Sequence, residues 1–216
     1  MRQIEKYVSE FIGTLILLLS IVGSGIMGQK LSQNEGIILL ANSLAIGFTL
    51  VFLIITFGKR SGAHFNPAVT LVMLLLDKIK KNEAFFYVIM QLTGACVGVI
   101  LANIIFDLNA ITLSSKHREG FQLNFSELIS TFGLILIIIL NQNKQIEVVG
   151  ALVGLYIAAA IWFMSSTAFA NPAVSLARML TDTFTGIHYS SVFPFIVSQF
   201  AGALLSLVIL KKIYKV

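Results

Sequence analysis

Charged residues and cysteine are both scarce in this sequence, and each scarcity excludes a class of protein. Only 12% of the 216 residues are charged, whereas a soluble domain carries roughly 25%. The chain therefore has too few charged side chains to cover a surface that faces water. The single cysteine, Cys96, excludes an internal disulfide and a paired-thiol metal or redox site. Of three scattered histidines, His117 and His188 are expected to lie in loops. Because no nucleophile, base and acid converge, we expect no enzyme activity, no cofactor and no metal site.

Apolar residues, in contrast, make up 57% of the chain and gather in long runs. A helix needs about 20 mostly apolar residues to cross a bilayer, and six segments approach or reach that length. Two more are too short to cross, because a helix rises only about 1.5 Å per residue. The six long segments are 7–27, 37–57, 84–106, 125–141, 147–166 and 190–210, and the short ones are 67–76 and 172–181. The sequence therefore predicts an all-α membrane protein surrounded by lipid.

The net charge of +5 indicates topology and not a nucleic-acid partner. The basic residues form no single patch, because they fall between the apolar segments. One path through the membrane places a large group on the side of both termini: Arg2, Lys6, Lys59, Arg60, Lys78, Lys80, Lys81, Lys144, Lys211, Lys212 and Lys215. Lys30, Lys116 and Arg118 fall on the other side. Since cytoplasmic loops are rich in Lys and Arg, we expect cytoplasmic termini, and the short termini favour a bacterial inner membrane.

Three short motifs occur twice in the same order, which indicates an internal repeat. Residues 10–14 (EFIGT) match 127–131 (ELIST), 66–70 (NPAVT) match 171–175 (NPAVS), and 91–95 (QLTGA) match 199–203 (QFAGA). Each half holds three long segments, so the second half must cross the membrane upside down relative to the first. We expect a single transmembrane domain of inverted repeats 1–106 and 125–216, joined by an outer loop 107–124. Inverted repeats with broken helices are a transport architecture.

Both short segments begin with Asn-Pro-Ala, at residues 66–68 and 171–173, and this triplet is a compact start signal for a helix. The Asn side-chain oxygen accepts hydrogen bonds from free N–H groups of the first turn. Pro suits the first helical position because it has no N–H to leave unsatisfied. A helix that begins inside a membrane exposes unpaired N–H groups, which is costly in lipid. Each start must therefore face protein or a water-filled cavity.

Two such starts placed tip to tip at the bilayer centre would create the chemistry of a pore. Each Asn oxygen caps a helix, so the NH₂ groups of Asn66 and Asn171 are left as donors facing the lumen. Two half-helix N-termini add partial positive charge, each roughly +0.5 e, which opposes the entry of cations. The preceding loops offer backbone carbonyls as acceptors, at Gly62, Ala63, His64, Ala168, Phe169 and Ala170. We therefore expect a passive conduit for neutral polar solutes.

The stretch from Ser61 to Thr70, SGAHFNPAVT, resembles the first signature loop of the aquaporin, or major intrinsic protein, family. The Glu and Gln anchors of the repeat fit the same family, so the resemblance covers essentially the whole chain. It implies six spanning helices around a pore in each subunit, and four identical subunits together. It also implies that Glu10 and Glu127 accept hydrogen bonds from the two re-entrant loops, which agrees with the need of an intramembrane carboxylate for a partner.

The sequence departs from this family directly after the second triplet, where most members have an Arg that helps form the narrowest part of the pore. Val174 stands there instead, and Arg178 follows one helical turn later. Counting from the two triplets places the other constriction positions at Ile46, Ala159 and Ala168. These apolar residues predict a wider and less polar neck than that of a water-selective member. The hypothesis that follows is passage of glycerol, urea or neutral metalloid hydroxides, with water as a companion.

Several alternatives stay open from the sequence. Arg178 reaches the outer end of the constriction, pairs with Asp182, four residues on, or anchors the outer loop. The chain is either a solute channel or a strict water channel, and an apolar neck that gates by dewetting would make it a closed, purely structural membrane protein. An ion-coupled transporter would instead use Glu10 and Glu127 to bind its ion.

Overall fold

Long helices and two half-length helices make up the fold, and no strand occurs among residues 3–215, which the computed structural model describes. The long helices are α1 (Gln3–Leu31), α2 (Glu35–Ser61), α4 (Lys81–Ile105), α5 (Phe121–Asn141), α6 (Ile146–Phe163) and α8 (Tyr189–Ile209). The short ones are α3 (Pro67–Leu75) and α7 (Pro172–Ala177), which a 3-10 turn, Arg178–Leu180, continues, while a π turn, Leu210–Tyr214, continues α8. Six helices are long and apolar enough to cross a membrane. The predicted all-α membrane architecture is confirmed.

α1, α2, α4 and α5 begin before the apolar runs from which they were predicted, whereas α6 ends at Phe163, three residues before its predicted end at 166. Asn34 caps α2 by accepting hydrogen bonds from the backbone N–H groups of Gly36 and Ile37. Gly62 ends α2 in the left-handed conformation, with φ of 88°, which glycine adopts without a Cβ clash. α5 begins at Phe121, so the predicted outer loop 107–124 is shorter than expected and its last residues are helical.

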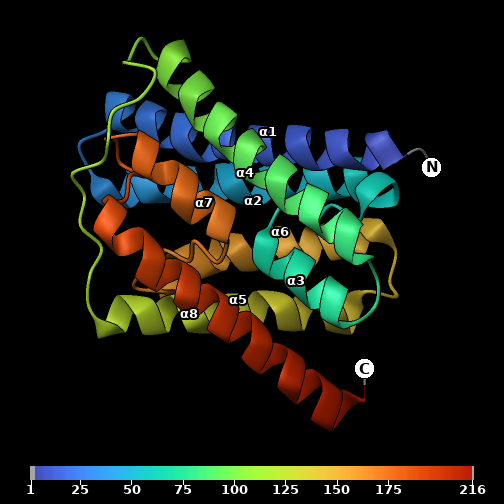
Figure 1. The fold of residues 1–216 in the computed structure, drawn as a ribbon. Helices are drawn as coiled ribbons and strands as arrows, with labels where there is room; N and C mark the ends of the chain where they lie inside the picture. The colour runs from blue at the N-terminus through green and yellow to red at the C-terminus, as the bar shows by residue number, and fades with distance from the viewer. Residues whose placement is uncertain (1–2, 216) are drawn as a thin grey trace.

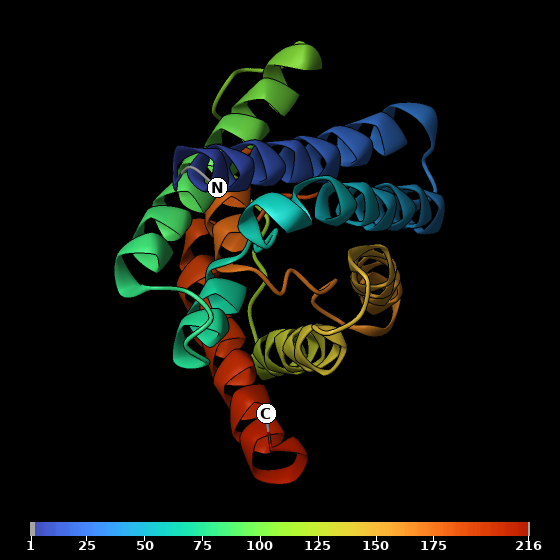
Figure 2. The ribbon, with the colours of Figure 1, turned by 90° about the vertical axis from the view of Figure 1, so that its right-hand side faces the viewer.

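The two halves of the chain run in opposite directions through the molecule (Figure 1). Both ends of the chain lie at the right-hand end of Figure 1, and the linker between α4 and α5 runs along the left-hand end. The half-helix α3 lies in the right-hand half and α7 in the left-hand half. In the first repeat α1 packs against α2 and α4, and in the second α5 packs against α6 and α8. Figure 2 shows α5 and α6 nearly end-on, and α1 and α2 side by side and oblique to the view.

Glycines allow the helices that cross α1 and α5 to approach closely. A Cβ on Gly94 of α4 would overlap the carbonyl oxygen of Phe11 in α1. A Cβ on Gly202 of α8 would likewise overlap the carbonyl oxygen of Leu128 in α5. Gly94 and Gly202 are equivalent positions of the QLTGA and QFAGA motifs. Both repeats therefore contain the same small-residue crossing, which is a common way to bring helices together in lipid.

Candidate functional site

A cavity of about 360 Å³ lies between the two halves of the chain. Its walls are mostly aliphatic side chains from α1, α2, α5 and α6, whereas α4 and α8 contribute no lining residue within the described part of the chain. Its polar groups come mainly from two loops, 62–66 and 167–171, which precede the half-helices α3 and α7. The cavity thus has an apolar wall with polar groups concentrated where the two repeats meet.

The backbone of both loops turns into the left-handed region at matching positions. Counting back from each Asn, the first, third and fourth residues have φ between 46° and 88°: Phe65, Ala63 and Gly62 in one loop, and Ala170, Ala168 and Thr167 in the other. A residue with a Cβ costs roughly 1–2 kcal/mol in this conformation. The loops therefore need specific interactions that compensate for this strain.

The fully buried Glu10 of α1 supplies those interactions to the first loop. One carboxylate oxygen accepts from Ser61 Oγ at 2.6 Å and from the backbone N–H of His64 at 3.0 Å. The other accepts from the backbone N–H of Phe65 at 2.7 Å and from Gln91 Nε2 at 2.8 Å. Hydrogen bonds to a carboxylate contribute about 1.5–3 kcal/mol each, so these four bonds oppose the backbone strain of the loop.

Glu127 of α5, also fully buried, holds the second loop in the same way. It accepts from the backbone N–H groups of Phe169 and Ala170, both at 2.9 Å, and from Gln199 Nε2 at 2.6 Å. Neither Glu10 nor Glu127 is among the residues that line the cavity. Both carboxylates are therefore occupied in positioning the loops, an arrangement that does not fit ion binding by a coupled transporter.

Asn66 and Asn171 tie the two half-helix starts directly together. The Asn66 Oδ1 accepts from the Ala68 backbone N–H at 2.8 Å, and Asn171 Oδ1 accepts from that of Ala173 at 2.9 Å. Each amide nitrogen then donates across to the opposite loop at 2.8 Å, Asn66 Nδ2 to the Ala170 oxygen and Asn171 Nδ2 to the Phe65 oxygen. An NH₂ group carries two donors, so one N–H of each Asn is left for the cavity that both residues line.

The backbone oxygens of the loops divide into bonded and free ones. The Ala170 oxygen, which the sequence assigns to the pore, accepts a hydrogen bond from Asn66 and has one lone pair left, because a carbonyl oxygen carries two. Among residues 3–215, the oxygens of Gly62, Ala63, His64, Ala168 and Phe169 receive no hydrogen bond from another protein group. These five residues all line the cavity. Their carbonyls are thus acceptors that a solute can use.

Four of the five residues expected at the constriction line the cavity: Ile46, Ala168, Val174 and Arg178. Ala159 does not, and its exposed side chain faces away from the cavity. Ile157 and Ile161 of the same helix line it instead. Ala159 lies two residues from each of them, which is about 200° around a helix. The sequence-based placement of Ala159 is therefore wrong.

The contacts of the Arg178 side chain distinguish between the roles that the sequence left open for it. Its guanidinium carbon lies 3.5 Å from the centre of the Phe169 ring, its Nε donates to the Thr185 oxygen, and its side chain is buried against the cavity. Asp182 takes different partners, because its carboxylate accepts from the backbone N–H and the hydroxyl of Ser115. The predicted alternative in which Arg178 pairs with Asp182 is not found, whereas the bond to the Thr185 oxygen agrees with the alternative in which Arg178 anchors the outer loop.

The family model described as major intrinsic protein matches residues 1–167. The chain belongs to the major intrinsic protein family. Its relatives include the aquaglyceroporin AqpS of Rhizobium meliloti (strain 1021), 43% identical over 207 residues, which cover 96% of this chain and 89% of the relative. Aquaporin NIP1-1 of Arabidopsis thaliana is 27% identical, over 93% of this chain and 71% of the relative. The aquaglyceroporin of Plasmodium falciparum shares the fold, with a TM-score of 0.81 and 23% identity over 99% of this chain and 97% of that one.

In this member of the major intrinsic protein family, two residues that the sequence marked only as topology signals line the linker end of the cavity. Arg118 is partly buried, and its Nε donates to the Gly186 oxygen at 3.1 Å. Lys116 donates through Nζ to the Phe184 oxygen at 3.0 Å. The linker reaches this place because its backbone pairs with the segment after α7, as in the Ser114 N–H to Met179 oxygen bond of 3.0 Å.

The basic side chains at the linker end influence one another electrostatically. Burial lowers the pKa of Arg118 to about 10, and the charge of Glu127 partly opposes this. Burial also lowers the pKa of Lys116, as do the charges of Arg118 and Arg178, while Glu35 acts in the other direction. A pKa of about 10 leaves Arg118 charged at neutral pH. The linker end of the cavity is therefore electropositive.

Proposed function

We propose that this chain is a membrane channel through which small uncharged solutes such as glycerol, urea or neutral metalloid hydroxides diffuse passively, together with water. The carrying observation is the lining of the cavity: Ile46, Ala168 and Val174, which stand at the positions expected for the neck, give it apolar surface. An apolar neck without a guanidinium directly after the second Asn-Pro-Ala leaves room for a solute larger than water. The relative from Rhizobium meliloti is an aquaglyceroporin, which agrees with this substrate class.

The polar groups of the cavity suit neutral molecules. A hydroxyl or amide solute can accept from the remaining N–H of Asn66 and Asn171 and donate to the free carbonyls of the two loops. Cations are opposed twice, by the partial positive charge of the two half-helix N-termini and by Arg118 and Arg178 at the linker end. The arrangement therefore favours uncharged permeants.

Stopped-flow light scattering on proteoliposomes tests this function. Water, glycerol and urea gradients are applied to one preparation, with protein-free liposomes as the control for lipid leakage. We expect solute-driven re-swelling well above that of the control. Fast water flux without solute entry would support the alternative of a strict water channel. No flux of any kind would support the closed, structural alternative.

We further propose a bacterial plasma membrane as the location, with cytoplasmic termini and four copies of the chain per assembly. Lys59, Arg60 and Lys211 lie on the side of the termini. Because cytoplasmic loops are enriched in basic residues, these residues support cytoplasmic termini. One relative comes from a bacterium. Reporter fusions at the C-terminus test the orientation, and native mass spectrometry tests the number of subunits; a periplasmic C-terminus or a monomer would contradict these two proposals.

A further inference from the structure

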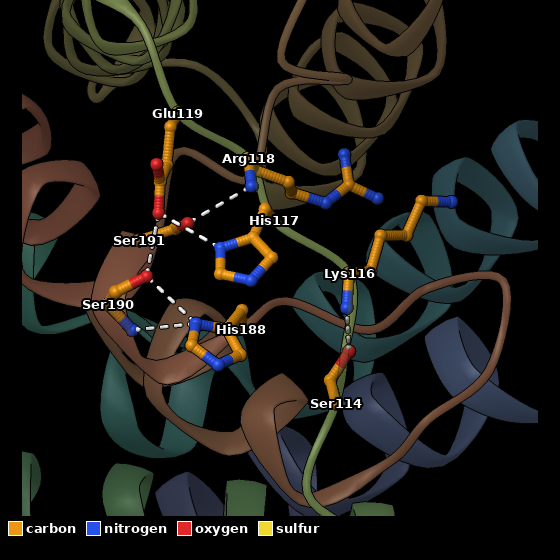
Figure 3. Close-up of polar contacts among 8 residues, drawn as sticks. All are labelled: Ser114, Lys116, His117, Arg118, Glu119, His188, Ser190 and Ser191. Atoms are coloured by element: carbon orange, nitrogen blue, oxygen red, sulfur yellow. Dashed lines mark hydrogen bonds and ion pairs between the residues drawn. The ribbon is translucent and has the colours of Figure 1, made fainter.

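Two histidines and a glutamate meet at the linker end of the molecule (Figure 3). His117 and Glu119 belong to the linker, and His188 precedes the first residue of α8. One nitrogen or oxygen atom from each of the three lies within 4.8 Å of the others. The two imidazole rings have centroids 3.9 Å apart. Residues distant in the sequence thus place three metal-ligating groups together, although the sequence predicted only loop roles for the two histidines and no metal site.

We propose that His117, Glu119 and His188 bind one divalent transition-metal ion of the Zn²⁺ or Ni²⁺ type. Imidazole nitrogen and carboxylate oxygen are ligands that suit these ions. Metal–ligand bonds of about 2.0–2.1 Å in a tetrahedron separate neighbouring ligand atoms by roughly 3.4 Å, so small side-chain rotations suffice to close the site. His117 and Glu119 are exposed, with 57% and 59% of their side chains accessible, and an ion can reach them from solvent.

The surroundings of Glu119 favour its role as a ligand. His117 Nδ1 lies 3.0 Å from Glu119 Oε1, and the Ser190 hydroxyl donates to the same oxygen at 2.7 Å. The Ser190 bond fixes the Glu119 side chain beside His117, and the carboxylate is the form in which a glutamate binds a metal. The metal would replace the hydrogen bond between His117 and Glu119.

The position of the cluster couples it to the pore, an inference that rests on the proposed channel function. His117 lies between Lys116 and Arg118, which both line the cavity. The backbone N–H of Arg118 donates to Ser191 Oγ at 3.0 Å, so the linker already contacts the start of α8. A metal that joins residues 117 and 119 to His188 would fix both basic side chains across the cavity mouth. Solute flux should then be slower with the metal bound.

Isothermal titration of the purified full-length protein in detergent with ZnCl₂ tests the site itself. We expect one ion per chain, and an affinity at least about tenfold weaker in His117→Ala, Glu119→Gln and His188→Asn. His188→Asn is included because His188 caps α8 through a bond to the Ser190 N–H, and Asn preserves a cap while removing the imidazole. Asp107→Asn removes another exposed carboxylate of the linker and should bind like the wild type. Equal affinity in the wild type and all three ligand variants would overturn the site.

Glycerol flux into proteoliposomes with Zn²⁺ on both sides tests the coupling. We expect Zn²⁺ to slow the wild type severalfold and to leave His117→Ala unaffected, with equal flux for the two proteins when a chelator removes the metal. Equal slowing of both proteins by Zn²⁺ would overturn the coupling. Metal-free flux reports the channel function and the titration in detergent reports the site, so the failure of either is distinguished from the failure of the other.

Discussion

Asn66 and Asn171 each perform two tasks with one side chain. The oxygen caps a half-helix, and the nitrogen donates to the loop in front of the other half-helix. Asp and Ser also make good helix caps, but neither side chain has an N–H group that could donate to the opposite loop. The two cross-links, from Asn171 to the Phe65 oxygen and from Asn66 to the Ala170 oxygen, use an amide N–H that Asp and Ser lack.

Replacing Asn171 by Asp separates these two tasks. The cap is preserved, but the donor to Phe65 is lost and a negative charge enters the pore centre. We expect a loss of stability of about 1–3 kcal/mol, since the buried Phe65 oxygen loses its partner. We also expect cation leakage to rise about tenfold, which corresponds to a barrier lowered by about 1.4 kcal/mol.

Sodium influx into dye-loaded proteoliposomes measures the leakage. Asn34→Asp is the matched control, because Asn34 caps α2 at an exposed position and has no partner loop to cross-link. Unchanged leakage in Asn171→Asp, with glycerol flux intact, would contradict the placement of Asn171 at the pore centre.

Glu10→Gln tests whether the intramembrane carboxylate is structural. Gln has one oxygen where Glu10 uses two, and its NH₂ group would face the N–H of Phe65 or His64. We expect a loss of several kcal/mol, about 1.5–3 for each lost hydrogen bond to charge, seen as a markedly lower Tm in detergent. A normally folded variant that lost only ion-dependent transport would instead support the coupled-transporter alternative.

The residues of the site that could be predicted are those whose chemistry is local. An Asn before Pro is a helix cap in any context, and a glutamate in an apolar helix needs partners, so both pairs were identified from the sequence. Lys116 and Arg118 were missed because their position depends on the path of the linker, which backbone bonds to residues 179 and 180 determine. No motif in the linker encodes that path.

At the scale of elements, the existence of each helix was easier to predict than its rotation. All six spans and both half-helices were found, since apolar runs and Asn-Pro-Ala starts encode them directly. The rotation of α6 was not encoded, because this helix is apolar on every side and has no polar face to orient it. Counting along the chain therefore placed Ala159 in the pore, whereas Ile157 and Ile161 line it.

The close packing of α5 against α8 depends on Gly202. A Cβ there meets the backbone of Leu128, which cannot rotate away. We expect Gly202→Val to cost at least about 1–3 kcal/mol, the usual range for overpacking, and to reduce the yield of folded protein. Thermal unfolding in detergent measures this, with Ala201→Val as the control because Ala201 is exposed on the same helix. Equal Tm values for the two variants would contradict the close crossing.

At the scale of the whole molecule, the two repeats have equivalent glutamates that hold the pore loops, but the basic residues that line the cavity lie at one end only. Glu10 and Glu127 hold equivalent loops through equivalent bonds. The basic residues Arg118 and Arg178, however, line only the linker end of the cavity, and the other end has aliphatic residues such as Met73 and Ile146. The basic side chains of the cavity therefore come from the segment after α7 and from the linker, while Val174 directly follows the second triplet.

Val174→Arg tests whether the missing side chain sets the selectivity of the whole channel. Val174 is 3% exposed and lines the cavity, and its backbone N–H lies within the cap of Asn171. An Arg there adds bulk to the neck and a third guanidinium beside Arg118 and Arg178. We expect glycerol flux to fall at least about tenfold, a barrier increase of about 1.4 kcal/mol, while water flux falls less.

The ratio of glycerol to water permeability, measured by stopped-flow light scattering on one preparation, shows the effect independently of the amount of protein inserted. Val174→Met is the matched control, because it adds length without charge or strong hydrogen-bond donors. A ratio lowered equally by Met and Arg would mean that bulk alone limits glycerol at this position. An unchanged ratio in Val174→Arg would mean that solutes do not pass this side chain at the narrowest point, and Ile46, Ala168 and the two guanidiniums at the linker end would then have to form the selective neck by themselves.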